Sequence, residues 1–192
     1  MLKFEEDQYG FMFKNNQGEA WVLPRPPYCD RGRYNWGQNG FSEEYVMPSM
    51  YFFDLEVAKE EISAFVFSST TQGKLSPNEQ ATELSLALQK EHSLVQNPSS
   101  PQSFMKMVPW PDGSTKVVEI KQVQVEYSNG ATENVWEVSQ GSLPFIDYAD
   151  QFPRHFRFIK NAVSEMNAFV ACRQLQALEY AQKEQPRPRV KP

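Results

Sequence analysis

The stretch Ala58–Val66, AKEEISAFV, recurs in altered form at Ala162–Val170, AVSEMNAFV, with five of nine positions identical. In both stretches, apolar side chains follow the three- and four-residue spacing of an amphipathic helix. A match of this size can arise by chance in a chain of 192 residues, because helices favour alanine and glutamate. The sequence before each stretch therefore decides whether the pair marks a repeat.

The sequences that precede the two stretches are also similar. A Pro-x-x-aromatic-x-Phe motif occupies Pro48–Phe53 in one case and Pro153–Phe158 in the other. Further upstream, each has a turn containing Asn and Gly that leads into a tryptophan-bearing strand, in the same order. We therefore expect an α+β fold made of two similar halves, each a β-hairpin or meander plus a helix, that arose by internal duplication. The alternative is that a hairpin followed by a helix is simply a common local arrangement.

The first half is expected to begin with a hairpin at Tyr9–Leu23, because two apolar and aromatic runs flank a turn at Asn15–Gly18. Asp54 is expected to cap a helix that ends near Phe67. Between hairpin and helix lies an irregular segment, residues 24–48, with four prolines and three glycines. It is long for a simple connection, which indicates either a functional insertion or a packed loop.

The middle of the chain carries a strong helix-start signal. Ser76–Glu79 combines a capping box with proline at the first helical position. The sequence predicts a surface helix from there to about Val95, which would bridge the two halves. The next stretch, Asn97–Pro101, has the composition of a linker.

The second half is expected to be a meander with turns at Pro111–Gly113 and Asn129–Gly130, followed by a helix over Arg154–Gln182. Along the middle strand the apolar positions change parity near Lys121, which predicts a β-bulge there. The proline-rich tail is expected to be disordered. The expected units are 1–70 with its insertion, 71–103 as bridging helix and linker, 104–183 as the second meander and helix, and 184–192 as the tail.

Composition limits the possible functions. Fourteen Phe, eight Tyr and four Trp favour a core built by aromatic packing, and Cys29 and Cys172 are expected to be free thiols in a reducing compartment. The acidic N-terminus and the lack of a long apolar run predict a cytoplasmic protein with no membrane partner. A net charge of −5 has the wrong sign for a general polyanion binder.

The insertion supplies the candidate binding residues. Within Arg25–Trp36, arginines interleave with large aromatic residues, which are the residue types that dominate protein-binding hot spots. The same mixture can stack bases and grip phosphates of single-stranded nucleic acid. An alternative is a packed loop in which the arginines pair with nearby acids. The predicted partner-binding residues are Arg25, Tyr28, Arg31, Arg33, Tyr34 and Trp36.

Enzymatic alternatives are weaker. Pro111-Asp112 followed by Glu119-Ile120-Lys121 has the bare pattern of the PD-(D/E)xK nucleases, but an extended strand would hold the two carboxylates ~20 Å apart. Cys29 lies beside arginines, yet no histidine is placed by the sequence to serve as its base. Zinc-ligand spacing, phosphate-binding glycine loops and Gly-x-Ser-x-Gly are missing from the sequence, so no cofactor or metal is expected.

The sequence thus favours a non-enzymatic binding or regulatory protein that docks on a protein or nucleoprotein partner through the aromatic and arginine loop. Single-stranded nucleic-acid binding through the same loop is the first alternative. A metal-dependent nuclease using Glu119 and Lys121 is the second.

Overall fold

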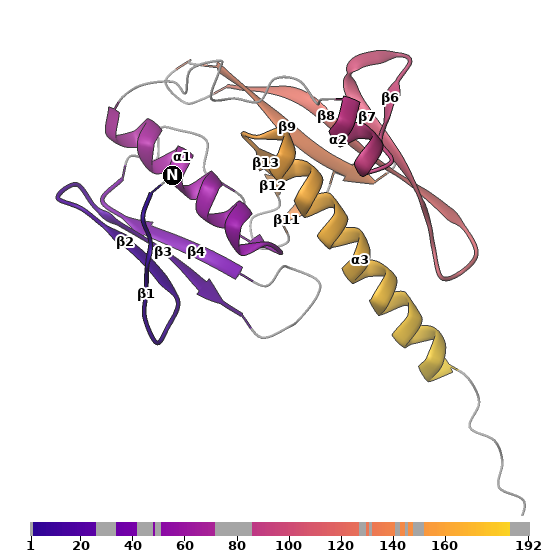
Figure 1. Cartoon of the computed structure of the whole chain (residues 1–192), viewed down its shortest axis with the longest axis horizontal. Coiled ribbons are helices and arrows are strands. Elements are labelled where there is room, and N and C mark those ends of the chain that lie inside the picture. Colours follow the sequence, from indigo (N-terminus) through magenta and orange to yellow (C-terminus); the bar gives the residue numbers. More distant parts are fainter. Residues whose placement is uncertain are drawn as a thin grey trace, which may run out of the picture.

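The computed structural model describes residues 2–25, 34–41, 48, 51–71, 86–126, 130, 132–140, 143–144, 146–147 and 152–184. These residues form an α+β fold with two antiparallel sheets and a long helix against each (Figure 1). The expected fold class is confirmed at this level.

The first sheet has the order β1-β2-β3-β4-β5 and carries helix α1 (Leu55–Thr71) on one face (Figure 1). Its strands are β1 (Glu5–Glu6), β2 (Phe11–Lys14), β3 (Glu19–Pro24), β4 (Tyr34–Asn39) and β5 (Tyr51–Phe52).

The second sheet has the order β10-β9-β8-β7-β6, with β13 also paired to β9, and packs against α3 (Ile159–Glu184). A short helix, α2 (Leu86–Glu91), precedes it, and β11 (Ile146–Asp147) pairs with β12 (Phe152–Pro153). The strands of the second sheet are β6 (Val95–Asn97), β7 (Ser100–Pro109), β8 (Thr115–Glu126), β9 (Thr132–Gln140), β10 (Leu143–Pro144) and β13 (His155–Phe156).

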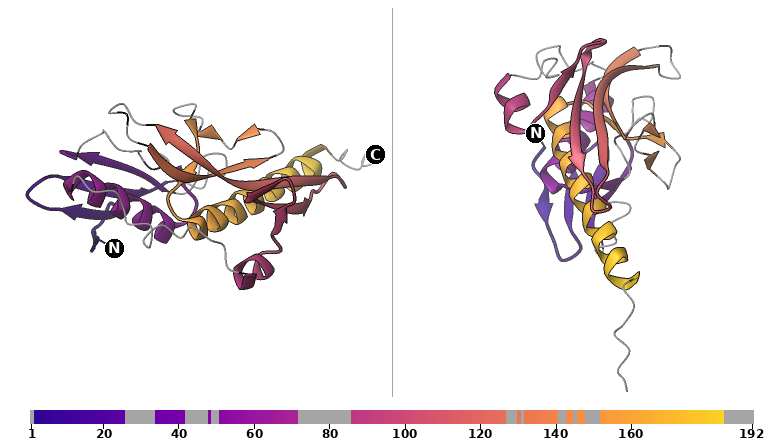
Figure 2. Two further views of the ribbon diagram at one scale, coloured as in Figure 1. Left: turned by 90° about the horizontal axis from the view of Figure 1, so that it is seen from above. Right: turned by 90° about the vertical axis from the view of Figure 1, so that its right-hand side faces the viewer.

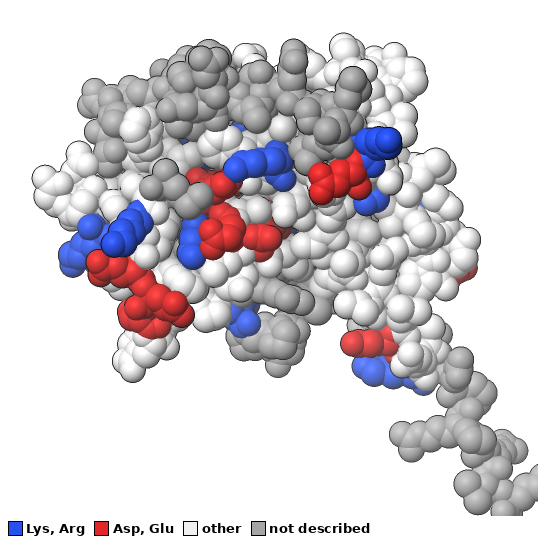
Figure 3. Space-filling view, viewed as in Figure 1, with Lys and Arg blue, Asp and Glu red and all other residues white. Residues whose placement is uncertain are grey.

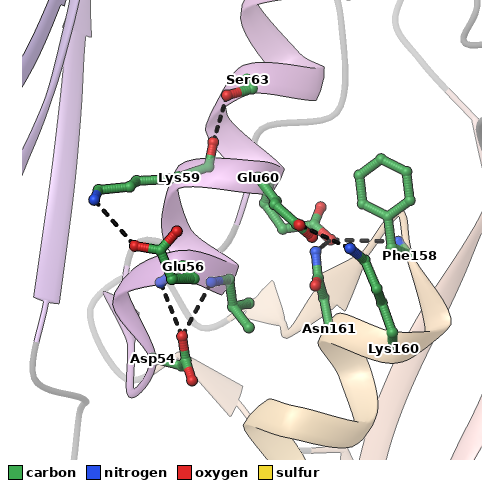
Figure 4. Close-up of polar contacts among 10 residues, drawn as sticks. Asp54, Glu56, Lys59, Glu60, Ser63, Phe158, Lys160 and Asn161 are labelled. Atoms are coloured by element: carbon green, nitrogen blue, oxygen red, sulfur yellow. Dashed lines mark hydrogen bonds and ion pairs between the residues drawn. The ribbon is translucent and has the colours of Figure 1, made fainter. Parts of the chain in front are cut away.

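The predicted hairpin and helix cap of the first half are confirmed. In the turn between β2 and β3, the side-chain oxygen of Asn15 accepts hydrogen bonds from the backbone N–H groups of Gln17 and Gly18, at 2.9 and 3.0 Å. Asp54 caps α1 by accepting from the backbone N–H of Glu56 at 2.8 Å (Figure 4). The helix continues to Thr71, past the predicted end near Phe67.

The irregular segment at 24–48 is not one loop, because it contains strand β4. This strand pairs with β3 from Pro24↔Tyr34 to Glu19↔Asn39. Its sequence, YNWGQN, lacks the apolar alternation that predicts a strand, so the pairing partner rather than local propensity determines it.

The predicted bridging helix and linker are wrong at their C-terminal ends. Helix α2 ends at Glu91, and Ser93 takes a positive φ of 55°, which turns the chain into β6 so that Val95 lies in a strand. Asn97–Pro101 is not a linker, because Asn97 ends β6, Ser100 and Pro101 begin β7, and only the turn residues Pro98 and Ser99 connect the two strands. The predicted helix start at Ser76–Glu79 lies outside the described residues.

The three-stranded meander of β7, β8 and β9 is confirmed, but the bulge near Lys121 is wrong. Pairing runs without a shift from Ser103↔Lys121 to Pro109↔Thr115 and along the whole β8–β9 ladder. The apolar pattern changes because both faces of β8 carry apolar residues: Ile120 is fully buried on the face toward α3, whereas Val123 on the other face pairs with buried Val135. Helix α3 begins later than the predicted Arg154, because the chain first forms β13 against β9.

Both halves contribute to one hydrophobic core. Trp36 and Phe65 of the first half meet edge to face at 5.5 Å, and Phe104 and Trp136 of the second half lie 6.3 Å apart. Phe52 and Phe156 join the halves, with ring centroids 6.5 Å apart and both side chains buried. The two halves therefore share the apolar interior on which their folding depends.

Two buried glutamates, one on each long helix, bind the chain of the other half. Glu61 on α1 accepts from the backbone N–H groups of Arg157 and Phe158, at 3.0 and 3.3 Å, and from the side chain of Asn161 at 2.8 Å. Phe158 and Asn161 are labelled in Figure 4.

Glu165 on α3 makes the matching contacts with the segment that leads into α1. Its carboxylate accepts from the backbone N–H groups of Phe53 and Asp54, both at 2.9 Å. Each helix thus caps the segment that leads into the other helix.

Burial strongly influences the charges of these glutamates. Desolvation raises the pKa of Glu165 to about 7, although Arg154, 3.8 Å away, acts in the opposite direction. Desolvation also raises the pKa of Glu61, with Arg157 partly offsetting it. The contacts that join the halves therefore carry an energetic cost when the carboxylates are ionised.

This cost predicts the pH dependence of stability. Between pH 4.5 and about pH 7, the unfolded chain releases the proton of Glu165 while the folded chain retains it, so the free energy of unfolding falls as pH rises. Relative to Glu165→Gln, the wild type should lose about 2–3 kcal/mol over this range. Urea denaturation at several pH values measures the difference. Glu60→Gln, at a surface ion pair with Lys160, is the control and should leave the pH profile unchanged.

Candidate functional site

Three of the six predicted partner-binding residues fall within the described part of the chain: Arg25, Tyr34 and Trp36. Tyr28, Arg31 and Arg33 lie outside it. The two ends of the predicted loop lie side by side, because Pro24 and Tyr34 are direct partners on the neighbouring strands β3 and β4.

Trp36 is buried, so its expected exposure is wrong. Its side chain is 3% exposed and packs edge-on against Phe65 of α1. The cause is the alternation of side chains along β4, which turns Trp36 and its cross-strand neighbour Val22 toward the helix. Tyr34, two residues earlier, is partly buried and packs against the same core.

The opposite face of the first sheet carries a second group of apolar and aromatic side chains, which we call the outer aromatic face. Cross-strand pairing brings Met12 and Trp21 into one row, and Leu23 and Tyr51 into the next. Met12 is 38% exposed, and the other three are partly exposed. Arg25 lies at the edge of this face, where β3 leaves the sheet.

Trp21 lies flat on the sheet because its neighbour on β4 is Gly37. A Cβ at Gly37 would come within 2.6 Å of the indole ring, so any larger residue would displace the tryptophan. Because the glycine has no side chain, the indole ring of Trp21 can pack directly on the backbone of the neighbouring strand.

Arg25 stacks on Tyr51. The guanidinium carbon lies 4.5 Å from the centroid of the tyrosine ring, which is the geometry of a cation–π contact. This contact attaches the start of the Arg25–Trp36 segment to the outer aromatic face. Sequence reasoning missed Tyr51 and Trp21 as members of this surface, since only the register of the strands brings them together.

Charge around the site is balanced. At the far end of the outer aromatic face, Lys14 pairs with Glu19 at 3.3 Å. On the side of the molecule seen in Figure 3, basic and acidic groups of the described residues are interspersed over α1 and the start of α3. Neither sign of charge therefore dominates on this side of the described residues.

A row of polar residues crosses the second sheet on the face away from α3. Ser103, Lys121, Glu137 and His155 are successive cross-strand partners on β7, β8, β9 and β13. Lys121 and His155 both contact the Glu137 carboxylate, at 2.9 and 3.5 Å, and desolvation lowers the pKa of His155.

The nuclease pattern is not assembled by this row. Glu119 accepts from Ser103 and Asn97, while Asp112 lies in the hairpin turn and accepts from the backbone of Ser114. In the described part of the chain, no three His, Cys, Asp or Glu residues form a group that could hold a metal ion.

A cysteine nucleophile, for which the sequence places no base, is also not assembled among the described residues. Cys172 is buried and is not part of a disulfide, and His92 contacts Asn167 through its Nδ1 at 3.1 Å. Cys29 lies outside the described residues.

No known protein family matches the chain, and no curated protein or solved structure does so either. Within the described residues, neither long helix is apolar enough along its length to span a membrane.

The burial of Trp36 predicts that this residue acts on stability. Trp36→Ala should lower the free energy of unfolding by about 3–5 kcal/mol, because it leaves a cavity between β4 and α1. Trp21→Ala, on the outer aromatic face, should cost much less. Urea denaturation measures both. A Trp36→Ala protein with the wild-type midpoint would contradict the assignment.

Proposed function

We propose that this chain is a non-enzymatic binding or regulatory protein that docks on another protein through the Arg25–Arg33 segment together with the outer aromatic face. The observation that carries the proposal is the stacking of Arg25 on Tyr51, which joins the arginine-rich segment to a partly exposed aromatic surface.

The position of the segment supports this proposal. It connects two adjacent strands of one sheet, a link that needs only a few residues, yet it spans residues 25–33. The additional residues include Tyr28, Arg31 and Arg33, whose types are over-represented at interface hot spots. An insertion with this composition is a common place for a binding function on a rigid scaffold.

Charge indicates the kind of partner. The segment carries three arginines and one acid, Asp30, in a chain whose net charge is −5. A partner with acidic side chains around an apolar centre would complement both the arginines and the outer aromatic face. We therefore expect the partner to present a mixed acidic and apolar surface.

Single-stranded nucleic acid is the second candidate. The flat seating of Trp21 on Gly37, together with the Arg25–Tyr51 stack, supports it, because bases stack on aromatic rings displayed by a sheet. The two candidates differ in their response to salt, since phosphate contacts make affinity fall steeply with ionic strength.

A metal-dependent nuclease is the third hypothesis; only the sequence pattern favours it, since among the described residues Glu119 contacts Ser103 and Asn97 while Asp112 lies in the hairpin turn. It predicts magnesium-stimulated cleavage of DNA or RNA that is lost in Glu119→Ala and in Lys121→Ala. Purified protein without such cleavage would end it.

We also propose that the two halves arose by duplication. Glu61 and Glu165 are 104 positions apart, and so are their backbone partners Phe53 and Arg157, and Asp54 and Phe158. The paired rings Phe52 and Phe156 have the same separation. Relatives of this chain should keep a glutamate at both positions or lose both; frequent loss of only one would count against a shared origin.

The binding proposal predicts that Tyr28→Ala, Arg31→Ala and Arg33→Ala, combined in one variant, will abolish partner capture and leave the urea midpoint nearly unchanged. The measurement is affinity capture by the immobilised full chain, followed by titration of the captured protein. Removing these contacts should weaken binding by about 100-fold or more.

The matched control removes a tyrosine and two cations elsewhere, at Tyr180, Lys183 and Lys90, all exposed. It should bind like the wild type. Equal capture by the triple variant would refute the proposal. Capture of nucleic acid that is lost in moderate salt would favour the second candidate.

A further inference from the structure

Helix α3 extends beyond the body of the protein. It runs for 26 residues, about 39 Å, and its C-terminal part passes the edge of both sheets (Figures 1 and 2). Its N-terminal half is anchored by buried residues such as Ala162, Met166 and Val170. From Leu175 onward, large apolar side chains of the helix are left exposed.

An apolar stripe lies on the side of α3 that faces away from the core. It consists of Ala168, Ala171, Leu175 and Leu178, spaced by three, four and three residues. At 100° per residue, these positions lie opposite Ala162, Met166 and Val170, which pack inward. Leu175 is 57% exposed and Leu178 is 47% exposed, whereas Ala171 is exposed and Ala168 half-buried, so the described body of the protein leaves the two leucines uncovered.

Side-chain size along the stripe is ordered, with two small residues followed by two large ones. In an antiparallel pair of helices related by a two-fold axis at position 173, Ala171 faces Leu175 of the second copy. Ala168 then faces Leu178. Each large side chain thus packs against a small one, which lets two helices approach closely without leaving a void. A parallel pair would set Leu against Leu and Ala against Ala, which leaves a gap at the alanines.

We infer that α3 is a self-association surface on which two copies of this chain pair antiparallel through Ala168, Ala171, Leu175 and Leu178. The arrangement is isologous, because the same stripe serves both copies. The contact covers about 15 Å of helix, which is short of the area that a permanent dimer buries, so association is weak and depends on concentration. This inference does not rest on the proposed function, which uses the first sheet.

The first experiment measures the mass of the full chain by sedimentation velocity from about 5 to 500 μM, the range in which small interfaces associate. The wild type should shift from monomer toward dimer. The Leu175→Asp, Leu178→Asp variant should remain monomeric, with a dissociation constant raised at least about tenfold. Tyr180→Asp is the matched control, since Tyr180 is 68% exposed on the other side of the helix, and it should associate like the wild type. Because all three positions are exposed, the thermal melts of the variants should match the wild type.

The second experiment tests the register. In a Cys29→Ser background, a chain carrying Ala171→Cys and Leu175→Cys should form a disulfide between position 171 of one copy and 175 of the other on mild oxidation. Peptide mass spectrometry identifies the linked positions. A wild type that stays monomeric throughout, a dimer insensitive to the two aspartates, or linkage of 171 to 171 would each overturn the inference.

Discussion

Each of the two long helices carries a buried carboxylate that accepts hydrogen bonds from the backbone of the other half, and the structure depends on these contacts. Glu61 and Glu165 together accept from four backbone N–H groups at the entrances to the opposite helices. Buried N–H groups are costly to leave unpaired, and buried carboxylates are costly to leave unsolvated, so each half compensates a cost in the other. The arginines 154 and 157 lower the cost of ionisation without removing it, since desolvation still raises the pKa of both carboxyls. The halves therefore form one cooperative unit around a shared core.

Local signals predicted the elements that local chemistry determines. The Asn15–Gly18 turn and the Asp54 cap could be read from sequence because each is satisfied by hydrogen bonds within a few residues. Strand β4 could not, since its polar sequence becomes a strand only by pairing with β3. The missing bulge at Lys121 has a related explanation. The alternation of apolar and polar residues along a strand indicates which of its two faces is buried. Along β8 both faces are buried in part, so the apolar residues change parity without a bulge.

The candidate site shows the same limit at the level of side chains. Residue types within Arg25–Trp36 predicted one continuous contact surface, but strand alternation turns Trp36 into the core while Arg25 lies on the opposite face of the sheet, stacked on Tyr51. The register that separates them also brings Trp21, Leu23 and Tyr51 together from distant positions. Composition therefore suggested which residue types a contact surface would use, and the pairing of strands decides which of the described ones share a face.

Both proposed surfaces consist of apolar side chains that the hydrophobic core does not include. The described interior is filled by residues from the two sheets and from the first half of α3, whereas the larger apolar groups on the outer face of the first sheet stay partly exposed and Leu175 and Leu178 of α3 are exposed. An exposed leucine costs the monomer little, and single ones need no explanation. Ordered spacing is different, because alanine before leucine at helical intervals, and a tryptophan packed on a glycine, each give the surface a defined shape, and the two proposals rest on these shapes. If both proposals hold, a paired molecule carries two copies of the outer aromatic face, and binding of both to one partner would raise the overall avidity without any new contact.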